Sequence, residues 1–154
     1  MLRITKQADY GIVLLSRMAG DPDRLFTANE MAAETGLPHP FVSKVLKLLV
    51  RGALLSSHRG VKGGYTLNRS AEGTTVFDII TVLEGPIAIT ECIDNRPGEC
   101  SQEPHCPVRG NWQRINDAIQ RALQDISLAD LTRASAPQLV TLGGPTTTRD
   151  AELT

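Results

Sequence analysis

The sequence predicts a mainly α-helical fold with a small β-hairpin wing: a winged helix-turn-helix followed by a long dimerisation helix. Three observations lead to this fold class. Two short helical segments are joined at a glycine, a glycine-rich hairpin pattern follows them directly, and a longer helix with heptad-like spacing comes later. With 154 residues, 41% of them hydrophobic and only 4% aromatic, the chain is long enough for one domain with an appendage and a mostly aliphatic core.

The first two helices follow from apolar periodicity and capping signals. Apolar residues recur at helical spacing over 5–19, which predicts a helix with one buried face. Thr27 and Glu30 form a capping-box pattern that opens a short helix over 28–35. Gly36 stands where a helix terminator is expected.

The third helix and the hairpin follow at once. Prolines at 38 and 40 suit the first turn of a helix that ends at Gly52. Its inward positions are expected to be Phe41, Val42, Val45, Leu46, Leu48 and Leu49. Short strands are predicted over 53–57 and 65–67, and three glycines between them allow a tight tip with positive φ. A hairpin directly after a helix-turn-helix is a wing.

The second half of the chain carries a cysteine loop and a long helix. A helix from Thr75 to about Leu83 precedes an irregular loop, and a helix is then predicted over 109–126. Its apolar positions have the 3, 4, 3, 4 spacing of a helix–helix seam, so we expect a dimer interface of Trp112, Ile115, Ile119, Ala122 and Ile126. Ser127 recaps a short last helix. We divide the chain into a winged helix-turn-helix (1–85), a cysteine-rich cluster-binding loop (86–108), dimerisation and terminal helices (109–133) and a disordered tail (134–154).

The net charge of −1 conceals a very uneven distribution of positive and negative residues along the chain. Residues 35–71 contain six Lys or Arg and no Asp or Glu, which gives +6. Residues 72–108 contain one Arg and seven acidic residues, which gives −6. The basic block coincides with the predicted helix-turn-helix and wing, where DNA phosphates would be met.

The basic block predicts a double-stranded DNA reader. The third helix fits a major groove, and the wing suits the narrow minor groove with its negative potential. One copy makes few contacts, so we expect a homodimer on a palindromic operator. The predicted DNA-binding residues are Lys6, His39, Phe41, Ser43, Lys44, Lys47, Arg51, Arg59, Lys62, Gly63 and Gly64.

Three cysteines, Cys92, Cys100 and Cys106, fall within one Pro- and Gly-rich loop. Their number is odd and no apolar run is long enough to cross a membrane, so we expect a cytoplasmic protein with reduced thiols and no membrane partner. Thiolates at this spacing are compatible with an iron–sulfur cluster, with zinc or with a metal-free thiol switch. The fourth-ligand candidates within the chain are His105, Glu91 and Glu103.

Several stretches make the chain resemble the small winged-helix bacterial regulators that include IscR and NsrR. These stretches are 2–6, Gly36-Leu37-Pro38, Ser57-His58-Arg59-Gly60 and Gly63-Gly64-Tyr65. The stretches 83–92 and 111–116 are most similar to the branch that regulates the SUF iron–sulfur assembly operon. The resemblance covers residues 1–133.

The resemblance implies a homodimeric regulator with an iron–sulfur cluster on the three cysteines. The histidine ligand of IscR-like members is replaced here by Arg109, whereas Asp9 matches the aspartate that NsrR-like members supply from the partner subunit. His105 is the weaker candidate. The departures from the family pattern leave the cluster type open between [2Fe-2S] and [4Fe-4S], of which we slightly favour [2Fe-2S].

The predicted function is therefore transcription regulation in response to cluster or redox status, as a repressor or sometimes an activator, of SUF-type cluster assembly genes. Two alternatives are a zinc-stabilised winged-helix adaptor for protein partners and a metal-free thiol redox switch. An enzyme is not expected, because the chain has no CxxC motif and no Cys/His pair on a rigid element.

Overall fold

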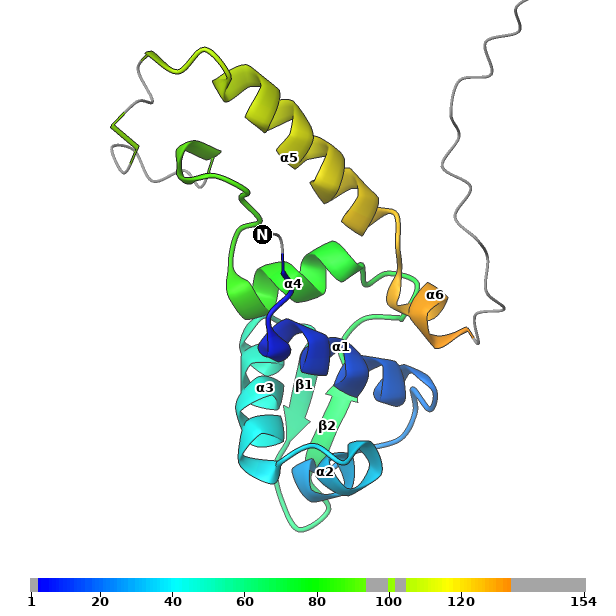
Figure 1. The fold of residues 1–154 in the computed structure, drawn as a ribbon. Helices are drawn as coiled ribbons and strands as arrows, with labels where there is room; N and C mark the ends of the chain where they lie inside the picture. Colours follow the sequence, from blue (N-terminus) through cyan, green and yellow to red (C-terminus); the bar gives the residue numbers. More distant parts are fainter. Residues whose placement is uncertain (1–2, 94–99, 102–104, 134–154) are drawn as a thin grey trace, which may run out of the picture.

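The structure, a computed structural model, describes residues 3–93, 100–101 and 105–133 (Figure 1). The order of elements is α1 (Lys6–Ala19), α2 (Ala28–Thr35), α3 (His39–Arg51), β1 (Leu55–His58), β2 (Gly64–Leu67), α4 (Val76–Glu84), the 3-10 turn η1 (Glu91–Ile93), α5 (Arg109–Gln124) and α6 (Leu128–Thr132). The mainly helical fold with one antiparallel hairpin is confirmed. The predicted tail over 134–154 lies outside the described residues.

Local capping explains why the first helices begin where they do. The Thr5 hydroxyl accepts a hydrogen bond from the backbone N–H of Ala8 at the start of α1. At α2 the Thr27 hydroxyl accepts from the Glu30 N–H, and the Glu30 carboxylate accepts from the Thr27 N–H. Gly36 adopts φ +70° and ends α2, as predicted.

The core lies where α1, α2 and α3 pack on one another and on the hairpin. Its largest fully buried side chains are Phe26, Leu14, Leu15, Met18, Met31, Leu46, Leu49, Leu55, Ile79 and Leu128. Only one of these is aromatic, in line with the aliphatic core expected from composition. Leu128 comes from α6, so the chain returns from α5 to close this core.

Helix α3 ends directly before Gly52, as predicted. Gly52 has an ordinary φ of −83°, and the left-handed conformation falls on Ala53 at φ +58°. A Cβ at Gly52 would lie 2.3 Å from the side chain of Val82 on α4. Glycine is therefore required at Gly52 for close packing of α3 against α4.

The first strand of the wing, β1, begins later than predicted. The predicted strand 53–57 is observed as Leu55–His58, because the turn at Ala53 is still hydrogen-bonded to the end of α3. Leu55 pairs with Leu67, and His58 pairs with Gly64. Phe26 adds an isolated bridge to Tyr65, with N···O distances of 3.0 and 2.7 Å, so the loop before α2 borders the hairpin.

The long helix ends earlier than predicted, at Gln124 instead of residue 126. The backbone N–H of Val76 donates to the Ile126 carbonyl, and the Leu128 N–H donates to the Thr74 carbonyl. This pairing draws the chain out of the helix, so placing Ile126 on the α5 seam was wrong. The loop 86–108 is also not wholly irregular, because η1 forms within it.

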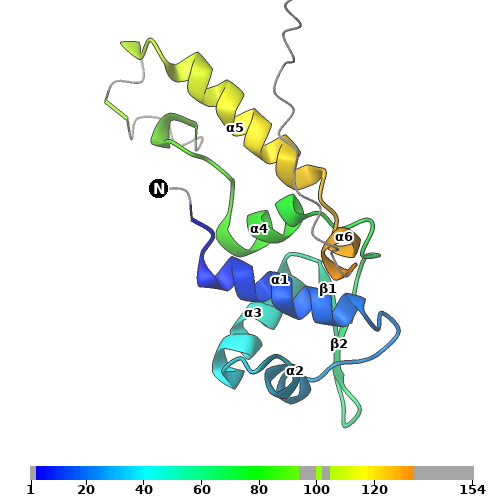
Figure 2. The ribbon, with the colours of Figure 1, turned by 45° about the vertical axis from the view of Figure 1, so that its right-hand side comes forward.

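The helix α5 extends away from the body formed by α1, α2, α3 and the hairpin, with α4 between them (Figures 1 and 2). The hairpin tip and the start of α5 lie at opposite ends of the molecule in both views. None of the helices described has the length and hydrophobicity needed to cross a bilayer.

The α2 capping box predicts a pH-dependent change in stability. Hydrogen bonds from the Thr27 backbone and then from its hydroxyl lower the pKa of Glu30 below its ordinary value of 4.5. Thr27→Ala is expected to lower the free energy of unfolding by about 1 kcal/mol at pH 7. Because the Glu30 pKa is lowered on folding, the contribution of its ionised form is present above pH 4.5 and is lost as the pH falls through the folded value.

Urea unfolding of both proteins at pH 7 and at pH 3 measures this effect. The gap between the wild-type protein and Thr27→Ala should narrow at pH 3. Asn29→Ala, at an exposed position in the same helix turn, serves as the control and should lose no stability at either pH. The Thr27 backbone N–H still donates to Glu30 in the variant, so a gap that stays constant with pH would contradict the hydrogen bond from the Thr27 hydroxyl to the Glu30 carboxylate.

Candidate nucleic-acid interface and cysteine segment

The exposed face of α3 presents cations to solvent. Lys44, Lys47 and Arg51 are exposed, while Val42 and Val45 on the opposite side are fully buried. None of the three cations has an ion-pair partner within the described part of the chain. Spacings of three and four residues place them on one side of the helix, where they are available to phosphates or bases.

The start of α3 is partly occupied by packing. The Phe41 ring is half-buried and meets the Tyr10 ring edge-on, with centroids 5.3 Å apart at 80°. Phe41 therefore joins α3 to α1, and only part of it is available to DNA. His39 and Lys6 are exposed at the first positions of their helices, whereas Ser43 is half-buried.

The wing tip carries Arg59 and Lys62, both exposed. Positive φ occurs at Gly60, at +116°, and not at the other two glycines of the tip. A Cβ at Gly63 would lie 2.4 Å from the His58 carbonyl oxygen, and one at Gly64 would lie 2.6 Å from the Phe26 carbonyl oxygen. Both of these predicted DNA-binding glycines thus have a structural reason to be glycine.

Val61 at the wing tip was not singled out in the sequence. Its side chain is fully exposed between the two cations. An apolar β-branched residue between a tip glycine and a lysine was the signal that could have identified it. Apolar side chains at such tips can contact sugars and bases in a minor groove.

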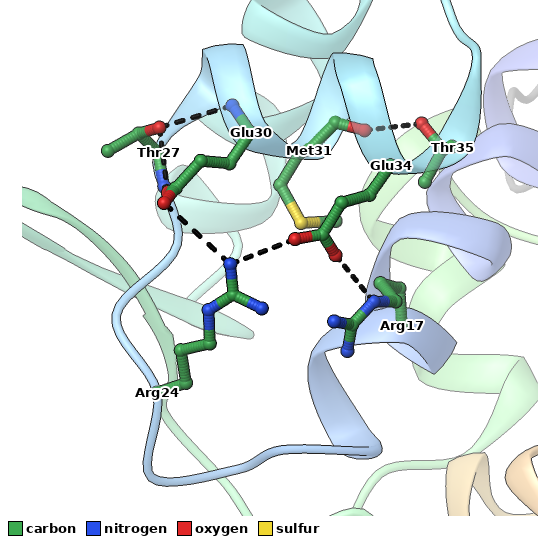
Figure 3. A network of polar contacts seen from close by, with 7 residues as sticks. All are labelled: Arg17, Arg24, Thr27, Glu30, Met31, Glu34 and Thr35. Carbon is green, nitrogen blue, oxygen red and sulfur yellow. Dashed lines mark hydrogen bonds and ion pairs between the residues drawn. The ribbon is translucent and has the colours of Figure 1, made fainter.

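A network of ion pairs connects α1, the loop after it and α2 (Figure 3). The Glu34 carboxylate on α2 forms ion pairs with Arg17 of α1 at 2.6 Å and with Arg24 of the intervening loop at 2.8 Å. The guanidinium carbons of both arginines lie over the Phe26 ring, at 5.3 and 4.6 Å from its centroid. These contacts join α2 to α1 and to the loop between them.

The cysteine segment is only partly described. Cys92 lies in η1, half-buried, with its Sγ 3.3 Å from the Thr90 hydroxyl oxygen. Cys100 and Cys106 are also half-buried. Residues 94–99 and 102–104, which include the candidate Glu103, lie outside the described residues.

The described residues do not assemble a metal site within this chain. Among them, no three His, Cys, Asp or Glu side chains are grouped so that they could hold a metal ion. His105, Glu91 and Asp9 are exposed. The soft thiol donors suit an iron–sulfur cluster chemically, but their geometry here does not match a formed ligand set.

Asn116 on α5 binds the backbone of the segment that precedes Cys92. Its side chain is almost completely buried, although most of α5 is exposed. The Asn116 Oδ1 accepts from the Ile89 N–H at 3.2 Å, and its Nδ2 donates to the Ile87 carbonyl at 3.1 Å. Gln120 donates to the same carbonyl at 3.0 Å. The only sequence signal was a polar residue beside the apolar seam.

The remaining seam residues divide into two sets. Trp112, Ile115 and Ala122 are exposed, and a groove of about 760 Å³ along α5 includes Ile115, Ile119 and Ala122 in its walls. Ile119 is half-buried and also borders a pocket of about 390 Å³ with Ile4, Ile80, Ile87 and Leu123. Thus α5 uses one side for its own chain and leaves other apolar residues uncovered.

Comparisons with known proteins identify the family. Residues 4–134 match the Rrf2 family model, described as iron-dependent transcriptional regulator. The chain belongs to the Rrf2 family. The Rrf2 match and the relatives described next make it a DNA-binding transcriptional regulator, in agreement with the expectation that it is not an enzyme.

Individual relatives match over most of their length. Protein aau3 of Rhizobium meliloti is 31% identical, over 90% of this chain and 89% of its own. The structure of CymR, the global cysteine regulator of B. subtilis, has 28% identity and a TM-score of 0.69, covering 88% of this Rrf2 chain and 99% of CymR. The T. potens IscR structure has 25% identity and a TM-score of 0.64, with 84% and 85% covered.

Proposed function

We propose that this Rrf2 protein is a homodimeric regulator whose affinity for a palindromic operator depends on the state of Cys92, Cys100 and Cys106. The observation that carries the proposal is the separation of two ends. One end presents exposed cations on α3 and the wing, which have no ion-pair partner among the described residues. The other end carries Cys92 in η1, which contacts α5, together with the half-buried Cys100 and Cys106.

The dimer is proposed to form through α5. Trp112 and Ile115 are exposed by 39% and 45%, which is unusual for large apolar residues on a helix that already has a buried side. A second copy packed on this helix would cover them and would place two basic faces on one duplex. The proposed dimer residues are thus Trp112, Ile115, Ile119 and Ala122, without Ile126.

An iron–sulfur cluster is the group we propose for the three cysteines, with [2Fe-2S] slightly favoured. Three thiols are soft donors, and Asp9 of a second copy is our candidate for the fourth ligand, because the described part of one chain does not complete a site. The similarity of stretches 83–92 and 111–116 to the branch that regulates the SUF iron–sulfur assembly operon supports SUF-type cluster assembly genes as the targets. The bound cluster would supply the signal, and the chain's residues would convert it into DNA affinity.

A metal-free thiol switch is the second candidate. The described residues show no grouped ligand set, and the similar B. subtilis CymR is described as a cysteine regulator. In this version, oxidation of a thiol would itself change the conformation of the segment.

Anaerobic purification separates the two candidates. We expect coloured protein with visible absorption, and with iron and acid-labile sulfide in equal amounts, since both cluster types contain them in that ratio. The Cys92→Ser variant should be colourless. Colourless wild-type protein with stoichiometric zinc, or without metal, would contradict the cluster.

A further inference from the structure

We propose that Asn116 is a positioning residue that couples the cysteine segment to α5, an inference that rests on the proposed function. Its side-chain amide holds the backbone on both sides of Ala88 and does so three residues before Cys92. A change at Cys92 therefore reaches α5 through this amide.

The burial of Asn116 points to a specific role. A buried amide is stable only when its donor and acceptor are both satisfied. Here both are satisfied by backbone groups of one short segment, 27 and 29 residues away in sequence, and by no group of α5 itself. An apolar residue would fill the position without fixing where the segment lies along α5.

The segment held by Asn116 also contacts the DNA-binding body. The Ile87 side chain packs against the cluster of Ala8, Val76 and Ile80. Just before it, the Leu83 carbonyl accepts a hydrogen bond from the Gln7 side chain at 2.6 Å. Segment 83–89 is thus hydrogen-bonded to α5 through Asn116 and to α1 through Gln7. A displacement of this segment therefore acts on both helices.

The direct test measures the reactivity of Cys92 in the full-length chain carrying Cys100→Ser and Cys106→Ser. The rate of alkylation by N-ethylmaleimide is followed by mass spectrometry. We expect Asn116→Ala to raise this rate about tenfold, because the released segment exposes the half-buried thiol. Gln113→Ala is the matched control, since Gln113 is exposed on α5 and its one side-chain hydrogen bond among the described residues goes to Asp117 in the same helix.

Coupling is read separately by hydrogen exchange of α5 before and after Cys92 is alkylated. With Asn116 present, alkylation should speed exchange across α5. With Asn116→Ala, exchange should be fast already and insensitive to alkylation. If Asn116→Ala does not fold, the same two measurements are made on Asn116→Asp. This variant keeps the acceptor for the Ile89 N–H and loses the donor to the Ile87 carbonyl.

The possible outcomes distinguish this inference from the proposed function. An unchanged alkylation rate, or an α5 response to alkylation that survives Asn116→Ala, overturns the positioning role. If operator affinity of the wild-type protein does not depend on its cysteines, the proposed sensing fails, yet the two measurements on Cys92 and α5 still decide the role of Asn116.

Discussion

Replacing Lys47 and Arg59 together by alanine is expected to weaken DNA binding on the order of a hundredfold at fixed salt. One residue lies on the exposed side of α3 and the other at the wing tip, and neither has an ion-pair partner in the described residues. Each cation that neutralises a phosphate releases counterions, and the two chains on one duplex lose four cations between them. The dependence of log affinity on log salt should therefore become less steep by about 3.6. The measurement is fluorescence anisotropy with the duplex that the wild-type protein selects from a random-sequence pool.

The control for this experiment is Arg133→Ala, an exposed cation at the end of α6. It should leave both the affinity and the salt dependence unchanged. Wild-type protein should bind with two chains per duplex. An unchanged salt dependence in the double variant would show that α3 and the wing do not meet the phosphates.

Phe26→Ala is expected to lower the free energy of unfolding by about 3–5 kcal/mol. Phe26 is the largest fully buried side chain in the described part of the chain, only 1% exposed, and its loss would leave a cavity between the helices and the hairpin. The two guanidinium groups over its ring would lose that contact as well. Urea unfolding followed by circular dichroism measures the effect.

Val61→Ala is the control for the stability experiment, since Val61 is fully exposed at the wing tip. It should leave the unfolding free energy within about 0.5 kcal/mol of wild type. A loss below 1 kcal/mol for Phe26→Ala would contradict the packing described for the loop before α2.

The helices of the DNA-binding body could be predicted because their signals are local. Thr27 and Glu30 cap α2 through contacts only three residues apart, and the same holds for Thr75 and Asp78 at α4. The basic face of α3 follows from helical spacing once the helix is known. These features depend on neighbours in sequence and not on the packing of distant segments.

Features set by distant contacts were missed or placed wrongly. The end of α5 depends on Val76 pairing with Ile126, so the heptad spacing extended the helix too far. The role of Asn116 depends on backbone groups of Ile87 and Ile89, and no local pattern marks it. Among the described residues, the three cysteines do not form a group that could hold a metal ion, so the cysteine ligand set stays a prediction.

In our proposal, the cysteine segment controls DNA affinity. The most direct test measures the affinity of one anaerobic preparation for the selected duplex before and after exposure to air, with the Cys92→Ser, Cys100→Ser, Cys106→Ser variant in parallel. We expect a change of at least about fivefold in the wild-type protein and none in the variant. Equal affinity of the wild-type protein before and after oxidation, with iron and thiol content shown to have changed, would contradict it.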